Sequence, residues 1–172
     1  MKYNFYKKCY EKNAAFIESR PALKKVLPLL DKGLTALFFL AYGGLCLYAL
    51  VKNMSAVVLM KILFPPMLCL LVVTVLRFTI DKPRPYTAEG AGITPLSTKK
   101  KGDNQSFPSR HIASAMVIAT TFYPFFPAIA IPLYCFAVLL TYVRFSLGLH
   151  YISDLAAGGA LGVVLGLVSY IL

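Results

Sequence analysis

The sequence predicts an all-α fold: a polytopic helical bundle in a membrane, with about five transmembrane helices and an N-terminal interfacial helix. Three observations predict it. Of the 172 residues, 58% are hydrophobic and 15% are charged, whereas about 25% of the residues in a soluble domain are charged. Long uncharged runs recur along the chain, and the charged residues lie mostly between them. This composition excludes a disordered chain, a coiled coil and a disulfide scaffold.

The beginning of the chain differs from the rest. Over residues 1–32, charged and apolar residues alternate too closely to leave a run that could cross a bilayer. An amphipathic helix lying in the membrane interface suits this mixture better. The sequence therefore predicts two regions, an interfacial amphipathic segment over 1–32 and a membrane-embedded domain over 33–172.

The predicted spans follow from uncharged runs of about 20 residues, the length that crosses a hydrocarbon core. Prolines at 65 and 66 are expected to kink the second span, and a Pro-rich segment at 123–127 divides a long run into two helices. Closely spaced glycines in the last span predict close contact with a neighbouring helix. The spans are residues 33–51, 55–76, two helices within 112–143, and 155–172.

Two polar segments between these spans are expected to meet. Residues 77–108 are rich in Pro and Gly and cannot span a membrane. An even number of crossings separates them from the turn at 144–154, so both lie on one membrane face. The N-terminal segment lies on that face as well.

The net charge is +11, from 18 Lys and Arg against 7 Asp and Glu. In a soluble protein this excess would indicate nucleic-acid binding. Here the basic residues flank apolar spans, where they would meet anionic lipid head groups, so no nucleic-acid partner is predicted. The four cysteines share no short spacing and are predicted to be small buried hydrophobic residues.

The remaining ionisable residues concentrate on the face where the two polar segments meet. Both histidines of the chain and four of its five arginines lie there. Guanidinium groups and a helix N-terminus neutralise phosphate oxygens, and a histidine can act as a nucleophile, so the combination indicates phosphoryl transfer. The groups are Arg77 with Lys82 and Arg84, Ser109-Arg110-His111 at the start of a predicted span, and Arg144 with His150 and Asp154.

The spacing of His150 and Asp154 suggests how one histidine is oriented. On a helix that begins near His150, positions four apart share a face, so the carboxylate is expected to accept a proton from one imidazole nitrogen. An isolated pair of His and Asp at this spacing is common on protein surfaces. The prediction rests on their combination with the cations.

These residues resemble the signature of the type 2 phosphatidic acid phosphatases, membrane relatives of vanadium haloperoxidases. That signature reads Lys, six residues, Arg-Pro; then Pro-Ser-Gly-His; then Ser-Arg, five residues, His, three residues, Asp. Arg77 stands at the signature's Lys, Arg110 at its Gly and Val143 at its first Ser of the third part. The matching residues run from Arg77 to Asp154, and no resemblance covers the N-terminal 50 residues.

The resemblance implies roles for individual residues. His150 would attack phosphorus and form a phosphohistidine, Asp154 would orient His150, and His111 would protonate the leaving oxygen and then activate water. No metal or cofactor is implied. The substrate would be a lipid phosphate or diphosphate such as undecaprenyl diphosphate, phosphatidylglycerol phosphate or phosphatidic acid. The residues implied to bind phosphate are Arg77, Lys82, Arg84, Ser109, Arg110 and Arg144.

Alternatives remain open at this stage. The same site could pass phosphate to another lipid, as a lipid phosphotransferase, or the basic face could bind anionic lipid without catalysis. The excess of Lys and Arg on the face of the site places it in the cytoplasm by the positive-inside rule. The resemblance instead implies the extracytoplasmic face of the cell membrane, which we adopt as the prediction for this multi-pass protein. The oligomeric state is not predicted.

Overall fold

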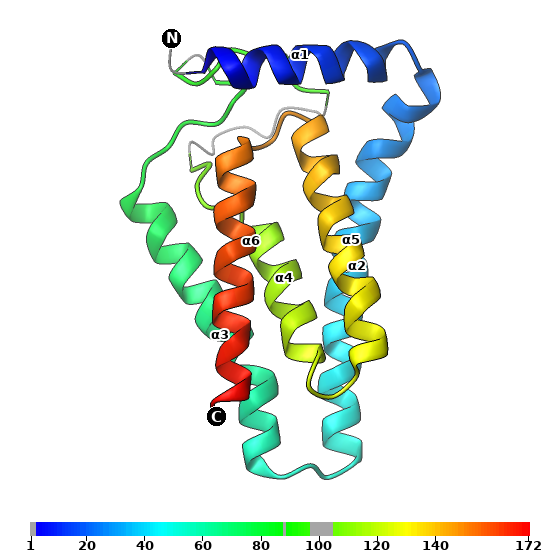
Figure 1. The fold of residues 1–172 in the computed structure, drawn as a ribbon, viewed down its shortest axis with the longest axis vertical. Coiled ribbons are helices and arrows are strands. Elements are labelled where there is room, and N and C mark those ends of the chain that lie inside the picture. The colour runs from blue at the N-terminus through cyan, green and yellow to red at the C-terminus, as the bar shows by residue number, and fades with distance from the viewer. Residues whose placement is uncertain (1–2, 88, 97–104) are drawn as a thin grey trace.

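The regular structure is helical throughout the part of the chain that the computed structural model describes, residues 3–87, 89–96 and 105–172. Figure 1 shows a bundle of helices with one helix, α1, lying across one end. This confirms the predicted all-α membrane bundle. The elements are α1 (Asn4–Glu18), α2 (Pro21–Val51), α3 (Ala56–Thr79), α4 (Arg110–Phe122), α5 (Pro127–Ser146), α6 (Ile152–Gly166) and the short 3₁₀ helix η1 (Leu167–Tyr170).

Helix α2 contains the first predicted span but begins earlier, at Pro21 rather than residue 33. Proline suits the first helical position because its missing N–H would have no partner there. The Lys-rich residues that follow favour helix and continue it into the apolar run. The distribution of charges correctly located the apolar run at 33–51, but it did not predict that the helix begins before this run. The division of the chain at residue 32 remains a prediction.

Helix α3 begins after Ser55, whose hydroxyl accepts a hydrogen bond from the Val58 N–H at 3.5 Å. It continues through Pro65 and Pro66 without ending, and Figure 1 shows it bending along its length. Its last turn carries Arg77. The helix thus delivers a site residue to the end of the bundle where α1 lies.

Four segments are long and apolar enough to cross a membrane: α2, α3, α5 and the stretch Ile152–Tyr170. The predicted span at the start of 112–143 is instead the shorter helix α4, which has 13 residues and is therefore about 20 Å long. A lone helix of that length would leave backbone groups in lipid. Here α4 packs against α2, α3, α5 and α6, so protein rather than lipid surrounds it.

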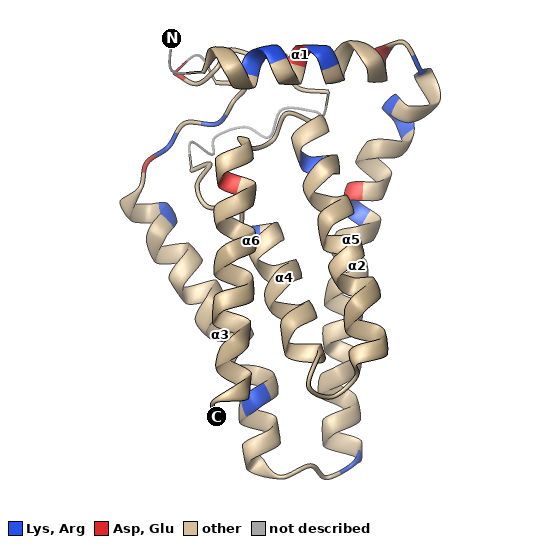
Figure 2. Ribbon diagram, viewed as in Figure 1, with Lys and Arg blue, Asp and Glu red and all other residues tan. Residues whose placement is uncertain are grey.

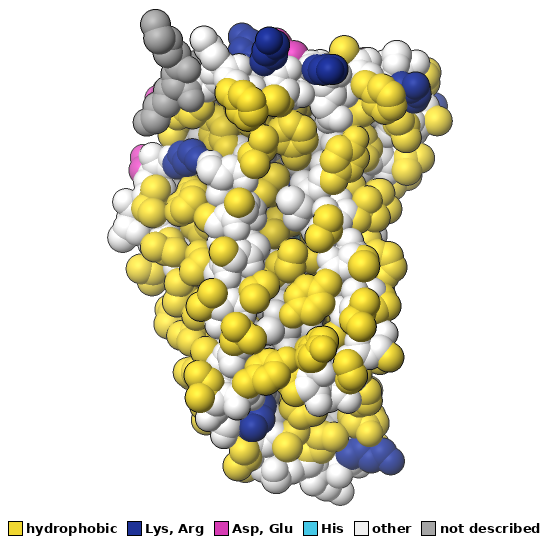
Figure 3. Space-filling model, viewed as in Figure 1, with side chains coloured by type: hydrophobic (Ala, Val, Ile, Leu, Met, Phe, Trp, Pro, Cys, Tyr) yellow, Lys and Arg dark blue, Asp and Glu magenta, His cyan; other side chains and the backbone are white. Residues whose placement is uncertain are grey.

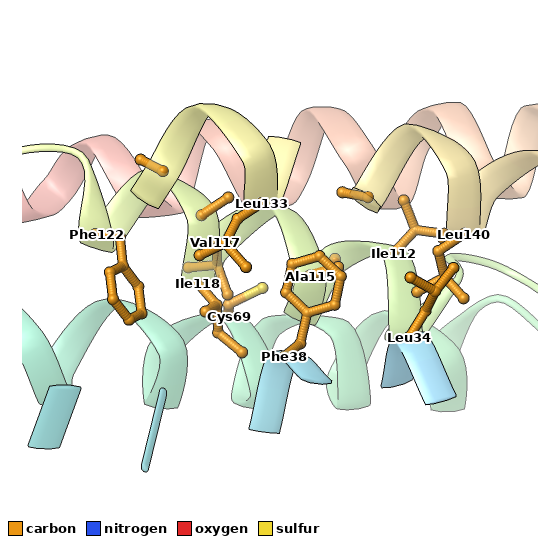
Figure 4. Packing of buried hydrophobic residues seen from close by; sticks show 14 of the residues in the cluster. Leu34, Phe38, Cys69, Ile112, Ala115, Val117, Ile118, Phe122, Leu133 and Leu140 are labelled. Carbon is orange, nitrogen blue, oxygen red and sulfur yellow. The ribbon is translucent and has the colours of Figure 1, made fainter. Parts of the chain in front are cut away.

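Glycines allow α4 and α6 to pack closely, as the glycine spacing predicted. A Cβ added at Gly162 would lie 2.5 Å from the Ala113 carbonyl oxygen, and one at Gly158 would lie 2.6 Å from that of Ser109. On its other sides α4 contributes Val117, Ile118 and Phe122 to the apolar core (Figure 4). The site residues at the start of α4 therefore stand on a rigidly packed helix.

The surface separates into an apolar belt and charged ends. Large apolar side chains are exposed along α2, α3, α5 and α6, and Figure 3 shows them covering much of the visible lateral surface. Lys and Arg gather at the end that carries α1 and are sparse at the opposite end (Figure 2). Together these features describe a multi-pass membrane protein with a charged face at the α1 end.

Candidate active site

The two polar segments meet at the α1 end of the bundle, as the crossing count predicted. The N–H of Ser109 donates to the Asp154 carbonyl oxygen at 3.0 Å, and the N–H of Ser106 donates to that of Lys82 at 2.8 Å. The first bond joins the residue before α4 to the start of α6, and the second joins the two ends of the segment between α3 and α4. The residues from the three sequence groups thereby come within one region of the molecule.

A cavity of about 490 Å³ opens in this region. Its walls come from the first part of α2, the end of α3, the following loop, the start of α4 and the turn between α5 and α6. Six of the nine predicted site residues line it: Arg77, Arg84, Arg110, His111, Arg144 and His150. The cavity is therefore basic and holds both histidines.

His150 is almost completely buried, with 1% of its surface exposed. Its Nδ1 lies 3.0 Å from the Ser106 carbonyl oxygen. A carbonyl oxygen only accepts hydrogen bonds, so Nδ1 carries the proton and Nε2 keeps its lone pair. Burial, and then the positive charges of Arg84, Arg144 and Arg77, hold the pKa of His150 well below its usual value. The imidazole is therefore neutral at neutral pH and able to act as a nucleophile.

The turn that carries His150 is fixed from the side of α1. The Tyr6 hydroxyl donates to the His150 carbonyl oxygen at 3.3 Å, and the Asn13 amide donates to the Ser146 hydroxyl at 3.0 Å. Gly148 has φ +72, and a Cβ there would lie 2.9 Å from the Tyr10 hydroxyl oxygen. Glycine therefore provides both the left-handed turn and the space for α1 to pack on it.

Asp154 is fully buried, but it does not hydrogen-bond to His150 as expected. Its Oδ2 lies 3.9 Å from His150 Nδ1 and accepts from the Ser106 hydroxyl at 2.5 Å and the Tyr151 N–H at 3.2 Å. Its Oδ1 pairs with Lys82. The reason is that α6 begins only at Ile152, so the helical i, i+4 geometry does not extend to residue 150. Asp154 reaches His150 through Ser106.

Three arginines around His150 are held in place. Arg77 donates to the Pro108 carbonyl oxygen at 3.1 Å and to that of Gln105 at 2.5 Å. Arg84 donates to the Leu149 carbonyl oxygen at 3.3 Å. Their guanidinium groups line the cavity beside His150. They provide a fixed positive wall for an anion.

Arg144 forms an ion pair with Asp31 of α2. The Arg144 Nε lies 2.9 Å from Asp31 Oδ1, and Nη2 donates to Oδ2 at 3.1 Å. Asp31 also lines the cavity. The pair joins the first part of α2 to the last turn of α5 and fixes the third guanidinium.

Two predicted phosphate ligands do not line the cavity. Lys82 binds Asp154 and donates to the Ser153 hydroxyl at 2.9 Å. Ser109 is fully buried against α6, and its hydroxyl has no hydrogen-bond partner among the described residues. Both residues contact α6 outside the cavity. Phosphate binding by their side chains remains a prediction.

Arg110 and His111 line a second, neighbouring cavity of about 330 Å³ as well as the basic one. This second cavity lies among α2, α3, α4 and α5, and its other lining residues are mainly apolar, including Phe38, Phe39 and Met67. The first turn of α4 thus separates a basic cavity from an apolar one.

Three contributors to the site were not predicted. Asp31 lies in the segment predicted to be interfacial, although a single acid among lysines just before an apolar run is a signal for a functional or paired residue. Ser106 orients His150 through its backbone carbonyl, which no side-chain pattern reveals. Tyr6 belongs to α1, which lies outside every motif.

The family model of the PAP2 superfamily matches residues 58–172. The chain belongs to the PAP2 superfamily. This confirms the family that the three-part spacing indicated and the predicted enzyme class, a phosphatase. The match covers α3 from its third residue, α4 to α6 and every predicted site residue, whereas the whole of α1 and α2 precedes it.

Two solved structures share the PAP2 fold with this chain. The structure of Aquifex aeolicus LpxE has a TM-score of 0.62 and 24% identity, over 88% of this chain and 94% of that one. A Bacillus subtilis PAP2-type phosphatidylglycerolphosphate phosphatase has a TM-score of 0.64 and 24% identity, over 97% of this chain and 85% of that one. No curated protein matches the sequence significantly.

Proposed function

We propose that this PAP2 protein is an integral-membrane phosphatase that hydrolyses lipid phosphates or diphosphates through a phosphohistidine formed on His150. The observation that carries the proposal is the buried imidazole of His150, whose Nδ1 lies 3.0 Å from the Ser106 carbonyl oxygen and which lines one cavity with three held arginines. Undecaprenyl diphosphate, phosphatidylglycerol phosphate and phosphatidic acid are the substrate types in view. The Bacillus subtilis neighbour is a phosphatidylglycerolphosphate phosphatase by name, which supports this class.

In the first step, the lone pair on His150 Nε2 attacks phosphorus while the bond to the leaving oxygen breaks. His111 gives its proton to that oxygen, so the lipid departs as an alcohol or, from a diphosphate, as a monophosphate. The guanidinium groups of Arg77, Arg84 and Arg144 stabilise the charge on the three equatorial oxygens. Nδ1 keeps its proton, and the Ser106 carbonyl stabilises the positive ring.

In the second step, His111 takes a proton from water, and the hydroxide formed attacks the phosphohistidine. The P–N bond breaks, inorganic phosphate forms and both histidines return to their starting states. The three fixed guanidinium groups supply the positive charge that a metal ion supplies in other phosphatases. The proposed chemistry therefore needs no metal and no cofactor.

The apolar cavity supports a lipid substrate. It meets the basic cavity at Arg110 and His111, so a head group beside His150 would place an attached chain among apolar side chains of α2 and α3. Burial of such a chain contributes about 0.8 kcal/mol for each CH₂ group. A soluble phosphate ester would gain nothing from this second cavity.

The test is phosphate release by the purified protein from a panel of lipid phosphates and diphosphates in detergent micelles. The wild type should release inorganic phosphate and His150→Ala should not, while Lys61→Gln, distant from the site, should match the wild type. Phosphate transfer to a second lipid without free phosphate would identify a phosphotransferase instead. Equal release by wild type and His150→Ala would contradict the proposal.

We propose the cell membrane as the location, with the α1 end on the extracytoplasmic face. The family resemblance supports this orientation, whereas the basic residues at the same end oppose it. Labelling of Lys12→Cys with an impermeant thiol reagent in intact cells tests it, because Lys12 is exposed on α1. The Cys-free background (Cys9, Cys46, Cys69 and Cys135 replaced) provides the control. Labelling only after lysis would place the site in the cytoplasm.

A further inference from the structure

Helix α1 lies at the level of the lipid head groups. Helix α5 has 20 residues and is therefore about 30 Å long, which is the thickness of a hydrocarbon core. At the end of α5, the Asn13 amide of α1 donates to the Ser146 hydroxyl at 3.0 Å, and the Tyr142 hydroxyl donates to Asn13 Oδ1 at 3.2 Å. Tyr142 is 48% exposed, and tyrosine is enriched at the border between hydrocarbon and head groups. Because α1 lies across this end of the bundle (Figure 1), the head groups of the surrounding leaflet reach it.

One side of α1 carries a stripe of aromatic and basic residues. Its members follow one another at spacings of three or four residues, which places them along one side of the helix. Two of them are strongly exposed, Phe5 at 77% and Phe16 at 51%. Arg20 continues the stripe, because its guanidinium carbon lies 3.8 Å from the centre of the Phe16 ring. Figure 3 shows apolar side chains directly below the Lys and Arg at this end of the molecule. The basic aromatic stripe consists of Phe5, Lys8, Lys12, Phe16 and Arg20.

The lysines of the stripe have no counter-ion among the described residues. Lys8 and Lys12 are exposed and form no ion pair with any of them. The other side of α1 differs, because it carries Glu11 and Glu18 and because Glu11 lies 3.9 Å from Lys7. The stripe thus has three positive charges without an acid, while the other side has one more acid than base. An anionic and partly apolar surface complements the stripe.

The face of α1 that packs on the bundle holds the turn of His150. Tyr6 donates to the His150 carbonyl oxygen at 3.3 Å. Asn13 joins Ser146, directly before this turn, to Tyr142 on the exposed side of α5. A ligand on the stripe is therefore one helix away from the turn that carries the histidine. The match to the PAP2 family begins at residue 58, so α1 lies outside the region that this match describes.

We propose that the basic aromatic stripe binds anionic phospholipids of the surrounding leaflet, and that this contact holds α1 on the turn of His150. Lys8 and Lys12 bind the lipid phosphates, and the two phenylalanine rings lie between the head groups. A membrane with anionic lipid therefore favours the arrangement in which His150 is fixed. The lipid contact stands independently of the proposed function, whereas its effect on catalysis rests on that function.

The lipid contact is measured with a single tryptophan, because the chain contains none. Full-length Phe16→Trp is reconstituted in vesicles of equal amounts of phosphatidylcholine and phosphatidylglycerol. One of the two lipids carries a nitroxide near the head-group end of an acyl chain. Quenching of the tryptophan fluorescence should be stronger when phosphatidylglycerol carries the nitroxide. Adding Lys8→Gln or Lys12→Gln should each lower this preference about fivefold.

The matched control is Ala15→Trp. Ala15 is also exposed on α1, but it lies about 100° around the helix from Phe16. Its tryptophan should be quenched weakly by both labelled lipids. Equal quenching of the two tryptophans, or equal quenching of Phe16→Trp by the two lipids, would overturn the proposal. Quenching of Phe16→Trp by neither lipid would mean that the stripe faces water, where a protein partner could cover it, and would overturn the proposal as well.

The effect on catalysis is measured as phosphate release from one lipid phosphate at saturating concentration, in vesicles with and without phosphatidylglycerol. For the wild type, kcat should rise about fivefold with the anionic lipid. Asn13→Ala should leave the quenching of Phe16→Trp unchanged but remove most of this rise, because α1 no longer bonds to Ser146. Asn4→Ala changes an exposed asparagine of the same helix, and as the matched control it should keep the rise.

The outcomes separate this inference from the proposed function. If the wild type releases phosphate with the same kcat in both membranes, or if only KM changes, the inference fails and the phosphatase proposal stands. If the wild type releases no phosphate in either membrane, the phosphatase proposal fails and the quenching decides on the lipid contact. A rise that Asn13→Ala retains in full would also overturn the inference, because the lipid would then act by a route other than α1.

Discussion

The two histidines lie in regions built in different ways. His150 lies in the turn between α5 and α6, where Ser106 holds its ring and Tyr6 of α1 bonds its carbonyl oxygen. His111 lies in the first turn of α4, is only partly buried and lines both cavities. One ring is fixed deep in the basic cavity, and the other stands at the border with the apolar cavity.

This difference suits two steps of phosphoryl transfer. A nucleophile needs a fixed tautomer and one direction of attack, which the contacts of His150 provide. An acid and base must reach the leaving oxygen of the lipid and afterwards a water molecule, which requires access from both cavities. The site thus combines a rigid turn, held by α1 and by Ser106 of the segment between α3 and α4, with an accessible helix start.

The largest expected effect comes from removal of the fixed ring. His150→Asn keeps a polar side chain of similar size but has no nucleophilic nitrogen, so phosphate release should fall by about 10⁴-fold or more. The measurement is the initial rate of phosphate release from a lipid diphosphate. Activity above about one hundredth of the wild type would assign the nucleophile to another residue.

A smaller effect is expected at the accessible ring. His111→Asn should lower the rate by about 10²- to 10⁴-fold, the usual contribution of general acid–base catalysis. The loss should shrink when the leaving group is a p-nitrophenolate, because that group departs without a proton. The loss in His150→Asn should stay the same with both leaving groups. Equal leaving-group dependence in the two variants would remove the distinction between the histidines.

The distance between His111 and His150 depends on how closely α4 and α6 pack. A Cβ at Gly158 would meet the Ser109 carbonyl oxygen at 2.6 Å, directly before the turn with His111, whereas one at Gly159 would have its nearest neighbour at 3.8 Å. Gly158→Ala should therefore displace the start of α4 and lower kcat about tenfold or more. Gly159→Ala is the matched control and should retain wild-type kcat. Equal activity in both variants would show that the distance between the helices is not critical.

The sequence predicted those parts of the molecule that local patterns determine. Uncharged runs predicted where the membrane-spanning helices lie. The number of crossings predicted that His111 and His150 lie on the same membrane face. Arg77 and Arg84 were predicted because their residue types and spacing match the signature, and both line the cavity. Helix α4 was the exception, because its short length depends on burial by its neighbours.

The parts that were not predicted depend on contacts between distant residues. Asp31 pairs with Arg144, 113 positions away in the chain, and no spacing rule relates two such residues. The orientation of His150 by Ser106 was missed because it involves a backbone carbonyl. The expected bond from Asp154 was wrong because the pattern of i, i+4 assumes a helix, and His150 precedes the helix.

The smallest expected effect is on the free energy of unfolding as the pH is lowered. It tests whether burial keeps His150 unprotonated. In the unfolded chain this histidine takes up a proton near pH 6.5. In the folded protein, burial and the nearby arginines keep the pKa of His150 well below that value. Between the two pKa values the unfolded state binds more protons, so the free energy of unfolding falls as the pH is lowered through about 6.5.

The measurement is thermal unfolding of wild type and His150→Asn in the same detergent between about pH 5.5 and 7.5. Other titrating groups, His111 included, are common to both proteins and cancel in the comparison. The difference in Tm, wild type minus variant, should decrease as the pH falls. Two parallel curves would mean that the ring of His150 accepts a proton in the folded state as readily as in the unfolded one. In that case burial would not keep the nucleophile neutral, and the contrast between the fixed and the accessible histidine would have to rest on their contacts alone.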